Sequence, residues 1–94
     1  QGEGAWAWDP RVVDWQGNEV LIHHAGEALR LDRLVHRRDT GEWWVLDHKS
    51  EWRPELKPGL QDKMNNYRAA VQAAYPQAVV RAAYLTAQGK LVNV

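Results

Sequence analysis

The residues of this sequence with the clearest capacity for chemistry are Asp32, Asp47 and Lys49. Asp47 and Lys49 are separated by one residue at the end of an apolar run, so a strand there points both side chains to the same face. An all-oxygen site of two or three carboxylates favours Mg²⁺ or Mn²⁺ over zinc. The pattern therefore predicts a site for a hard divalent cation.

The expected turns decide whether the carboxylates meet. A turn over residues 38–41 places Asp32 opposite Asp47 in an antiparallel hairpin, and a turn at residues 25–26 places Glu19 opposite Asp32. Like charges at opposed positions repel and destabilise a sheet, so such a row makes sense when a divalent cation lies among the carboxylates. A slip of one residue would turn Asp32 to the other face.

A second interpretation of the same residues requires no cation. On a solvated sheet face, side chains of alternating charge form a salt-bridge ladder, which here would consist of Arg30, Asp32, Asp47 and Lys49. Spacing alone leaves both interpretations open.

A mixed β-sheet with one covering helix is expected to position these residues. The hydrophobic pattern predicts, in chain order, strands over residues 19–24, 27–36 and 43–50, a helix from Leu60 that ends at Pro76, and strands over residues 78–86 and 90–94. Short turns make the first three strands an antiparallel meander, whereas the helix makes a crossover that leaves its flanking strands parallel. The βββαββ order belongs to the α/β or α+β class.

Composition is typical of one small globular domain. The chain has 94 residues, 45% hydrophobic and 26% charged, and no cysteine, which excludes disulfides, thiolate zinc sites and a cysteine nucleophile. The lack of cysteine agrees with a cytoplasmic protein, and no apolar run approaches the roughly 20 residues that cross a bilayer, so no membrane partner is expected. Because the chain begins at Gln1, we expect a fragment of a larger protein.

The two ends of the chain differ in charge and in pattern. Residues 1–26 carry mostly acidic charges and residues 51–94 mostly basic ones, which suits a cation site beside a polyanion groove, although charge alone favours a solvated surface. Residues 1–17 are expected to be an irregular lead-in with one short strand at most. Their tryptophans Trp6 and Trp8 would share one side of an extended chain, where packing is more common than stacking on bases.

The ordered set of motifs resembles a nuclease family. The stretch LRLDRLVHRRDTGEWWVLDHKS resembles the core of the PD-(D/E)xK nucleases, and more narrowly the C-terminal nuclease domain of RecB- and AddA-type helicase–nucleases. In that family an Asp on the second strand is followed by a strand of the form apolar-apolar-Asp-x-Lys. The segments NEVLIHH, NNYRAAVQAAYP and VVRAAYLTAQGKLVNV are similar to its first strand, its helix and its closing strands. The likeness covers residues 18–94.

The resemblance implies roles for individual residues. Asp32, Asp47 and the main-chain carbonyl of His48 would bind Mg²⁺ or Mn²⁺, and the cation would activate a water and polarise the scissile phosphate. Lys49 would hold that water or stabilise charge on the phosphate oxygens, while Glu19 would support the site from outside. The residues expected to face DNA are Arg30, Gln61, Lys63 and Tyr67.

The sequence departs from the family pattern in two places. Family members have a helix before the first strand that supplies a metal-binding His, but nothing upstream of Glu19 predicts a helix and no His lies there. The family helix usually carries Gln four residues before its Tyr, where this chain has Lys63, with Gln61 near. We therefore expect a restriction-endonuclease-like core that lacks its first helix, in which Lys63 could contact a phosphate instead.

By resemblance, the expected function is metal-dependent hydrolysis of DNA. The chain would be the exonuclease V-like module of a RecB/UvrD-like helicase–nuclease in break repair and recombination, acting on single-stranded ends. Its partners would be helicase domains of the same polypeptide and other subunits. The alternatives are a catalytically incomplete module that binds DNA or docks on a partner, and a plain structural domain. The His48 side chain, on the face opposite Asp47, is expected to pack rather than to act.

Overall fold

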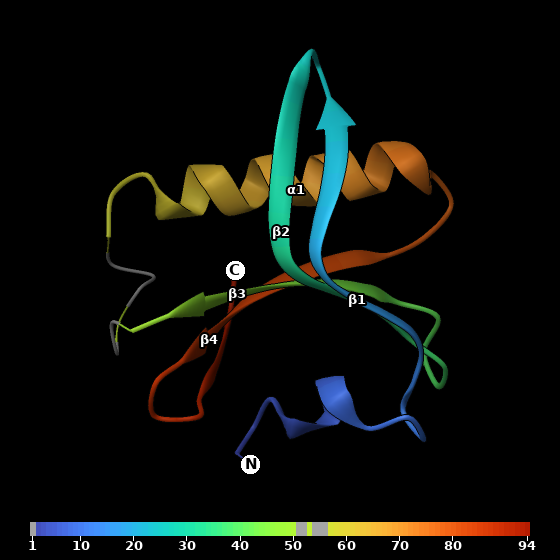
Figure 1. The fold of residues 1–94 in the computed structure, drawn as a ribbon, viewed down its shortest axis with the longest axis vertical. Coiled ribbons are helices and arrows are strands. Elements are labelled where there is room, and N and C mark those ends of the chain that lie inside the picture. The colour runs from blue at the N-terminus through green and yellow to red at the C-terminus, as the bar shows by residue number, and fades with distance from the viewer. Residues whose placement is uncertain (1, 51–52, 54–56) are drawn as a thin grey trace.

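The chain folds into one mixed sheet with a helix on each side. The computed structural model describes residues 2–50, 53 and 57–94 (Figure 1). Its elements are the 3₁₀ helix η1 (Ala5–Trp8), strands β1 (Val13–His24), β2 (Glu27–Arg37) and β3 (Trp43–Lys49), helix α1 (Leu60–Ala74), and strands β4 (Val80–Thr86) and β5 (Leu91–Asn93). The α+β class and the order of the main elements agree with the sequence-based expectation.

The sheet has the predicted topology and register. Its strands follow in chain order, antiparallel between β1 and β2, between β2 and β3 and between β4 and β5, and parallel between β3 and β4. Leu34 lies opposite Val45, which is the register that the turn over residues 38–41 predicts. Val20 lies opposite Leu31, as the turn at residues 25–26 predicts. Both hairpins therefore have the register that was expected to place Asp32 opposite Asp47 and Glu19 opposite Asp32.

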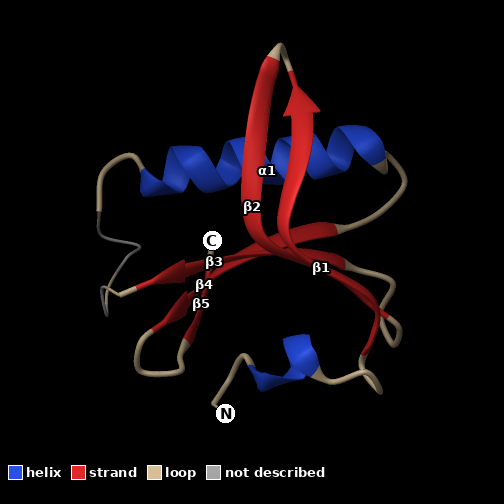
Figure 2. Ribbon diagram, in the orientation of Figure 1, coloured by secondary structure: helices blue, strands red, loops and turns tan. Residues whose placement is uncertain are grey.

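Two apolar layers lie on the two faces of the sheet (Figure 2). Helix α1 covers one face, where Met64, Tyr67 and Val71 pack against Leu34 and Val45. The 3₁₀ helix lies on the other face, where its Ala7 joins a smaller cluster that also contains Val13, Val35, Trp44, Leu46, Ala83 and Leu85. In the described part of the chain, no helix is long and apolar enough to cross a membrane.

The start of the first strand was predicted wrongly. Strand β1 begins at Val13 rather than at Glu19, because the polar stretch before Glu19 pairs with the second half of β2. Trp6 and Trp8 lie in a 3₁₀ turn and not in an extended segment. Trp6 packs edge-on against Trp44, with ring centroids 5.1 Å apart, as the packing interpretation expects, whereas Trp8 is 46% exposed, contrary to it. Smaller differences are that α1 ends at Ala74, β4 starts at Val80 and β5 spans Leu91–Asn93.

A local irregularity bends the first hairpin beside the predicted site. Glu19 has a left-handed backbone (φ 51°), which is uncommon for a residue with a side chain. Leu31 and Leu34 both face α1, although an odd spacing normally places two residues on opposite faces. The alternation therefore changes phase at Asp32 and Arg33. Beyond this bend the hairpin of β1 and β2 rises across α1 (Figure 1).

Candidate metal centre

Asp32 and Asp47 meet at the bend of β2 and the end of β3. Their carboxyl groups lie close enough to shift each other's pKa. Oδ2 of Asp32 also accepts the main-chain N–H of His48 at 2.9 Å. Asp47 is 2% exposed, whereas the Asp32 side chain reaches the surface. The pair that the register predicts is therefore formed, with one buried carboxyl and one solvated carboxyl.

The pKa values of the two carboxyl groups are shifted in opposite directions. Burial raises the pKa of Asp47, the adjacent Asp32 carboxylate raises it further, and the hydrogen bond from Lys49 only partly opposes this. Burial also acts to raise the pKa of Asp32, but the hydrogen bonds from Asp47 and from the His48 N–H outweigh it and leave that pKa lowered. Two carboxylates in contact cannot both ionise freely, so Asp47 is the harder of the two to ionise.

Lys49 supplies the positive charge of the site. Its Nζ lies 2.7 Å from Oδ2 of Asp47, and its side chain is 17% exposed. The predicted common face of Asp47 and Lys49 is therefore observed, and part of the salt-bridge ladder exists as well. An ammonium this close compensates the buried carboxyl when no metal ion is bound.

Tyr84 is a neighbour that the sequence-based reasoning missed. It lies beside Asp47 on β4 in the parallel register and is 1% exposed. Burial first, and then the Asp47 charge, raise the pKa of its phenol. Its hydroxyl has no hydrogen-bond partner among the described residues. A helical crossover does not reveal the register of a parallel pair, so the sequence offers no direct signal for this contact.

Glu19 does not complete the predicted row of three carboxylates. The register places it across from Asp32, because its neighbours Asn18 and Val20 pair with Arg33 and Leu31. Its exposed side chain forms an ion pair with Arg30 instead. Glu19 still lines a surface hollow of about 390 Å³ together with Asn18, Asp32 and His48. Among the described residues, no group of three or more His, Cys, Asp or Glu side chains is placed to hold a metal ion.

The His48 side chain was expected to pack rather than to act, but it does not pack in the core. It lies on the face opposite Asp47, as strand alternation requires, but it is 57% exposed. Its Nδ1 is 3.9 Å from Oδ2 of Asp32, and its ring centroid is 6.1 Å from that of Trp8. The bend in β2 brings Asp32 close enough for this contact, which regular alternation did not predict.

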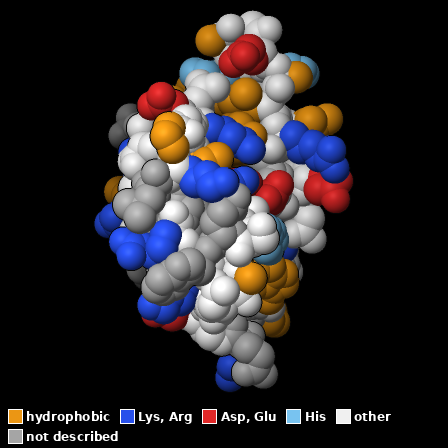
Figure 3. All heavy atoms as spheres, turned by 90° about the vertical axis from the view of Figure 1, so that its left-hand side faces the viewer, with side chains coloured by type: hydrophobic (Ala, Val, Ile, Leu, Met, Phe, Trp, Pro, Cys, Tyr) orange, Lys and Arg blue, Asp and Glu red, His pale blue; other side chains and the backbone are white. Residues whose placement is uncertain are grey.

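The residues expected to face DNA are divided between surface and core. Lys63 and Gln61 are exposed near the start of α1, and the Lys63 ammonium lies 5.6 Å from the ring centroid of Tyr67. Tyr67 itself is 9% exposed and packs in the core, and Arg30 is ion-paired with Glu19. Figure 3 shows Lys and Arg side chains gathered around acidic groups on the face where β3 ends and α1 begins.

The donor chemistry of the pair fits a hard divalent cation. Mg²⁺ is commonly bound through one or two carboxylates, with waters and substrate phosphates as the other ligands, so two aspartates suffice. The N–H and C=O of a strand residue point to the same side, and the His48 N–H points at Asp32. The His48 carbonyl oxygen therefore faces the same side as well. A cation would also neutralise the repulsion that raises the pKa of Asp47.

Comparisons with known proteins assign no family. No protein-family model matches the chain, and no curated protein matches it. The functional assignment therefore depends on the residues and geometry described above.

Proposed function

We propose that the chain is a metal-dependent DNA nuclease domain whose centre is Asp32, Asp47 and Lys49. The observation that carries the proposal is the contact between the carboxyl groups of Asp32 and Asp47, with one of them buried. Opposed carboxylates cost stability, and the chain places one of them in a surface hollow and the other, buried, next to a lysine. Perturbed acids of this kind cluster at functional sites.

Each residue has a defined part in the proposed reaction. Asp32, Asp47 and the His48 carbonyl would hold Mg²⁺ or Mn²⁺. When bound, such an ion activates a water and polarises a phosphate. Lys49 donates hydrogen bonds to the phosphate oxygens, on which negative charge develops. The buried Asp47 keeps the Lys49 ammonium in place. The low exposure of Asp47 and Lys49 strengthens these interactions, because less water screens them.

The wider setting belongs to the same proposal. By its resemblance to the PD-(D/E)xK nucleases, the domain would act on single-stranded DNA ends. It would be attached to the helicase domains of a RecB/UvrD-like protein that works in break repair and recombination. Its location would be cytoplasmic. Lys63 on α1 would attract the phosphates of the approaching DNA.

Cleavage of a labelled single strand tests the proposal. With Mg²⁺ or Mn²⁺ in excess, we expect slow cleavage of single-stranded DNA that stops when a chelator is added. The rate should be low, because the site as described contains two carboxylates and no third ligand side chain. Duplex DNA without a free single strand should be cleaved less. Absence of cleavage with both metals at high protein concentration would exclude catalysis by this chain.

A non-catalytic DNA-binding module is the second candidate. The observations that favour it are the ion pairs that already engage two of the site's acidic groups, Lys49 with Asp47 and Arg30 with Glu19. A cation must compete with the first of these. This candidate predicts DNA binding that depends on salt and persists in Asp47→Ala.

Lys63→Ala is expected to weaken binding of single-stranded DNA equally for different sequences. Lys63 is an exposed cation near the start of α1, so its loss removes one phosphate contact and lowers the slope of log K against log salt by about 1. Titrations at several salt concentrations measure this slope. Arg11→Ala is the control, because Arg11 is 88% exposed, pairs with Asp9 and does not line the hollow that contains Asp32. An equal change in both variants would contradict a specific contact at Lys63.

A further inference from the structure

Trp8 stays exposed beside the carboxylate pair. It is the last residue of η1, and 46% of its surface is accessible. Large aromatic side chains are highly buried on average, and exposed ones are enriched where a protein binds a partner. The ring of His48, which contacts Asp32, lies 6.1 Å from the Trp8 ring. The exposed indole is therefore separated from Asp32 by one side chain, that of His48.

Arg33 holds the Trp8 ring in place. Its guanidinium lies 4.4 Å from the centroid of the indole, and the residue is 1% exposed. It donates hydrogen bonds to the Ala7 carbonyl at 2.6 Å and to Oδ1 of Asn18 at 2.7 Å, and also to Gln16. A buried arginine fixed by three acceptors leaves the indole little freedom. An aromatic surface ordered in advance loses little entropy when it binds a ligand.

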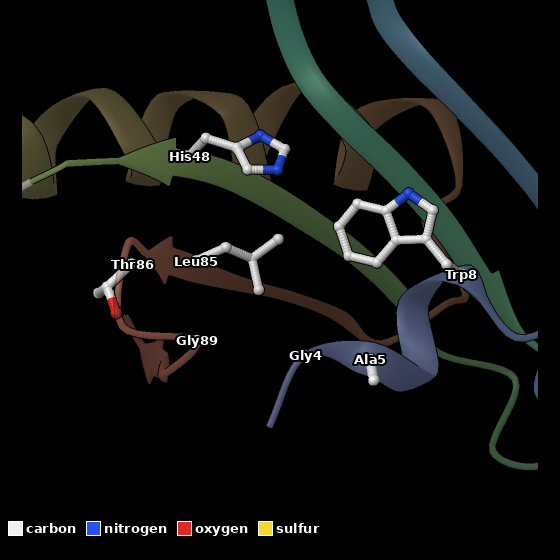
Figure 4. Close-up of a pocket in the computed structure, with 7 residues that line it drawn as sticks. All are labelled: Gly4, Ala5, Trp8, His48, Leu85, Thr86 and Gly89. Carbon is white, nitrogen blue, oxygen red and sulfur yellow. The ribbon is translucent and has the colours of Figure 1, made fainter. Parts of the chain in front are cut away.

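A small pocket opens next to this fixed ring. Its volume is about 160 Å³, and it is lined by Gly4, Ala5, Trp8, His48, Leu85, Thr86 and Gly89. Figure 4 shows the rings of Trp8 and His48 pointing toward each other, with Leu85 below His48 and Thr86 at one side. Pockets for drug-sized ligands have about 300–1,000 Å³. This one therefore suits a single flat ring system with polar edges, whose attached groups remain outside.

Gly4 keeps the apolar side of the pocket closely packed. A Cβ at this position would lie 2.3 Å from Cδ2 of Leu85, so a larger residue would displace the leucine. The start of the chain is also held to the β4–β5 turn, because the Glu3 N–H donates to the Gly89 carbonyl at 3.0 Å. The pocket is thus built from η1, the end of β3 and the end of β4, which are far apart in the sequence.

His48 is shared by the pocket and by the hollow that contains Asp32. We infer that the Trp8 pocket takes one unstacked nucleobase of a nucleic-acid strand whose adjoining phosphate enters the hollow lined by Asn18, Asp32 and His48. This inference rests on the proposed function and specifies its substrate. Stacking on an indole accepts every base, because each has a flat π face. Bases paired in a duplex cannot enter, so the pocket selects single strands.

Binding of strands with and without bases tests the pocket. The probes are a labelled oligothymidylate and an abasic deoxyribose-phosphate strand of equal length, both in chelator so that no cleavage occurs. The wild-type protein should bind the thymidine strand about tenfold more tightly than the abasic strand, the difference that one stacked base contributes. Trp8→Ala should remove this preference, and Trp8→Phe should retain most of it.

Trp15→Ala is the matched control. Trp15 is also 46% exposed, but its ring lies against Trp43 and does not line the pocket. This variant should keep the full preference for bases. If Trp8→Ala does not fold, as its thermal unfolding will show, His48→Ala replaces it, because the main-chain N–H that binds Asp32 is retained.

The results separate this inference from the nuclease proposal. A preference for bases that is unchanged in Trp8→Ala, or lost equally in Trp15→Ala, would overturn the pocket and leave metal-dependent cleavage standing. A Trp8-dependent preference without any cleavage would support the pocket and exclude the nuclease. Competition by thymidine monophosphate that equals the strand's own affinity would overturn the inference of a strand ligand in favour of a free nucleotide.

Discussion

Asp47→Ala is expected to slow metal-dependent cleavage of single-stranded DNA about a thousandfold. The substitution removes one of the two carboxylates that would hold the cation and also the group that positions the Lys49 ammonium at 2.7 Å. Both losses act on charge at the reacting phosphate. Single-turnover assays with excess protein measure the rate independently of product release.

Asp39→Ala is the control for that experiment. Asp39 follows β2, is 54% exposed and pairs with Arg37, so its removal should leave the cleavage rate unchanged. Asp47→Asn keeps the size of the side chain and should lose cleavage as Asp47→Ala does, even if the alanine variant unfolds. Cleavage at the wild-type rate in a folded Asp47 variant would show that a contaminating nuclease or another site cuts the DNA.

Asp32→Asn should abolish cleavage and at the same time stabilise the fold. The asparagine carbonyl can still accept the His48 N–H, which Asp32 accepts at 2.9 Å. Its amide can donate to the Asp47 carboxylate, where the wild-type protein has a second negative charge. Replacing a repulsion by a hydrogen bond should raise the free energy of unfolding at pH 7 by about 1 kcal/mol. Chemical denaturation in metal-free buffer measures it.

The stability gain of Asp32→Asn should depend on pH. Burial first, and then the Asp32 carboxylate, raise the pKa of Asp47 in the folded protein. A group whose pKa is raised by folding contributes stability that is fully present below its pKa in the unfolded chain, which is about 4 for Asp. This stability is lost as the pH rises through the pKa of the group in the folded protein. The lowered pKa of Asp32 acts in the opposite direction, but this carboxyl is solvated and contributes less. The variant should therefore gain most near neutral pH. A gain that shrinks as pH rises from 4 to 7 would contradict the charge repulsion.

The main features of the sheet follow from local patterns in the sequence. The turns at residues 25–26 and 38–41 set the register of two hairpins, and the opposition of Leu34 and Val45 follows directly. That register brings Asp32 to Asp47, so the pair could be predicted from turn positions alone. The common face of Asp47 and Lys49 follows from strand alternation.

Other parts of the site depend on contacts between distant segments. The start of β1 at Val13 is stabilised by pairing with β2, although its own residues are mostly polar. The left-handed backbone of Glu19 and the change of phase near Asp32 bring His48 within 3.9 Å of that carboxylate. Trp8 lies near the site because the guanidinium of buried Arg33 packs on its ring. Hydrophobic periodicity and residue spacing do not predict contacts of this kind.

Binding of Mn²⁺ tests the central claim, that Asp32 and Asp47 form a cation site, most directly. Loss of the free-ion electron paramagnetic resonance signal can be titrated for the wild-type chain, Asp32→Asn, Asp47→Asn and the control Asp39→Ala. We predict one site of roughly millimolar affinity in the wild type and the control, as expected for few ligands, and none in the two site variants. Binding that is unchanged in Asp32→Asn and Asp47→Asn, or no binding in the wild type, would contradict the account.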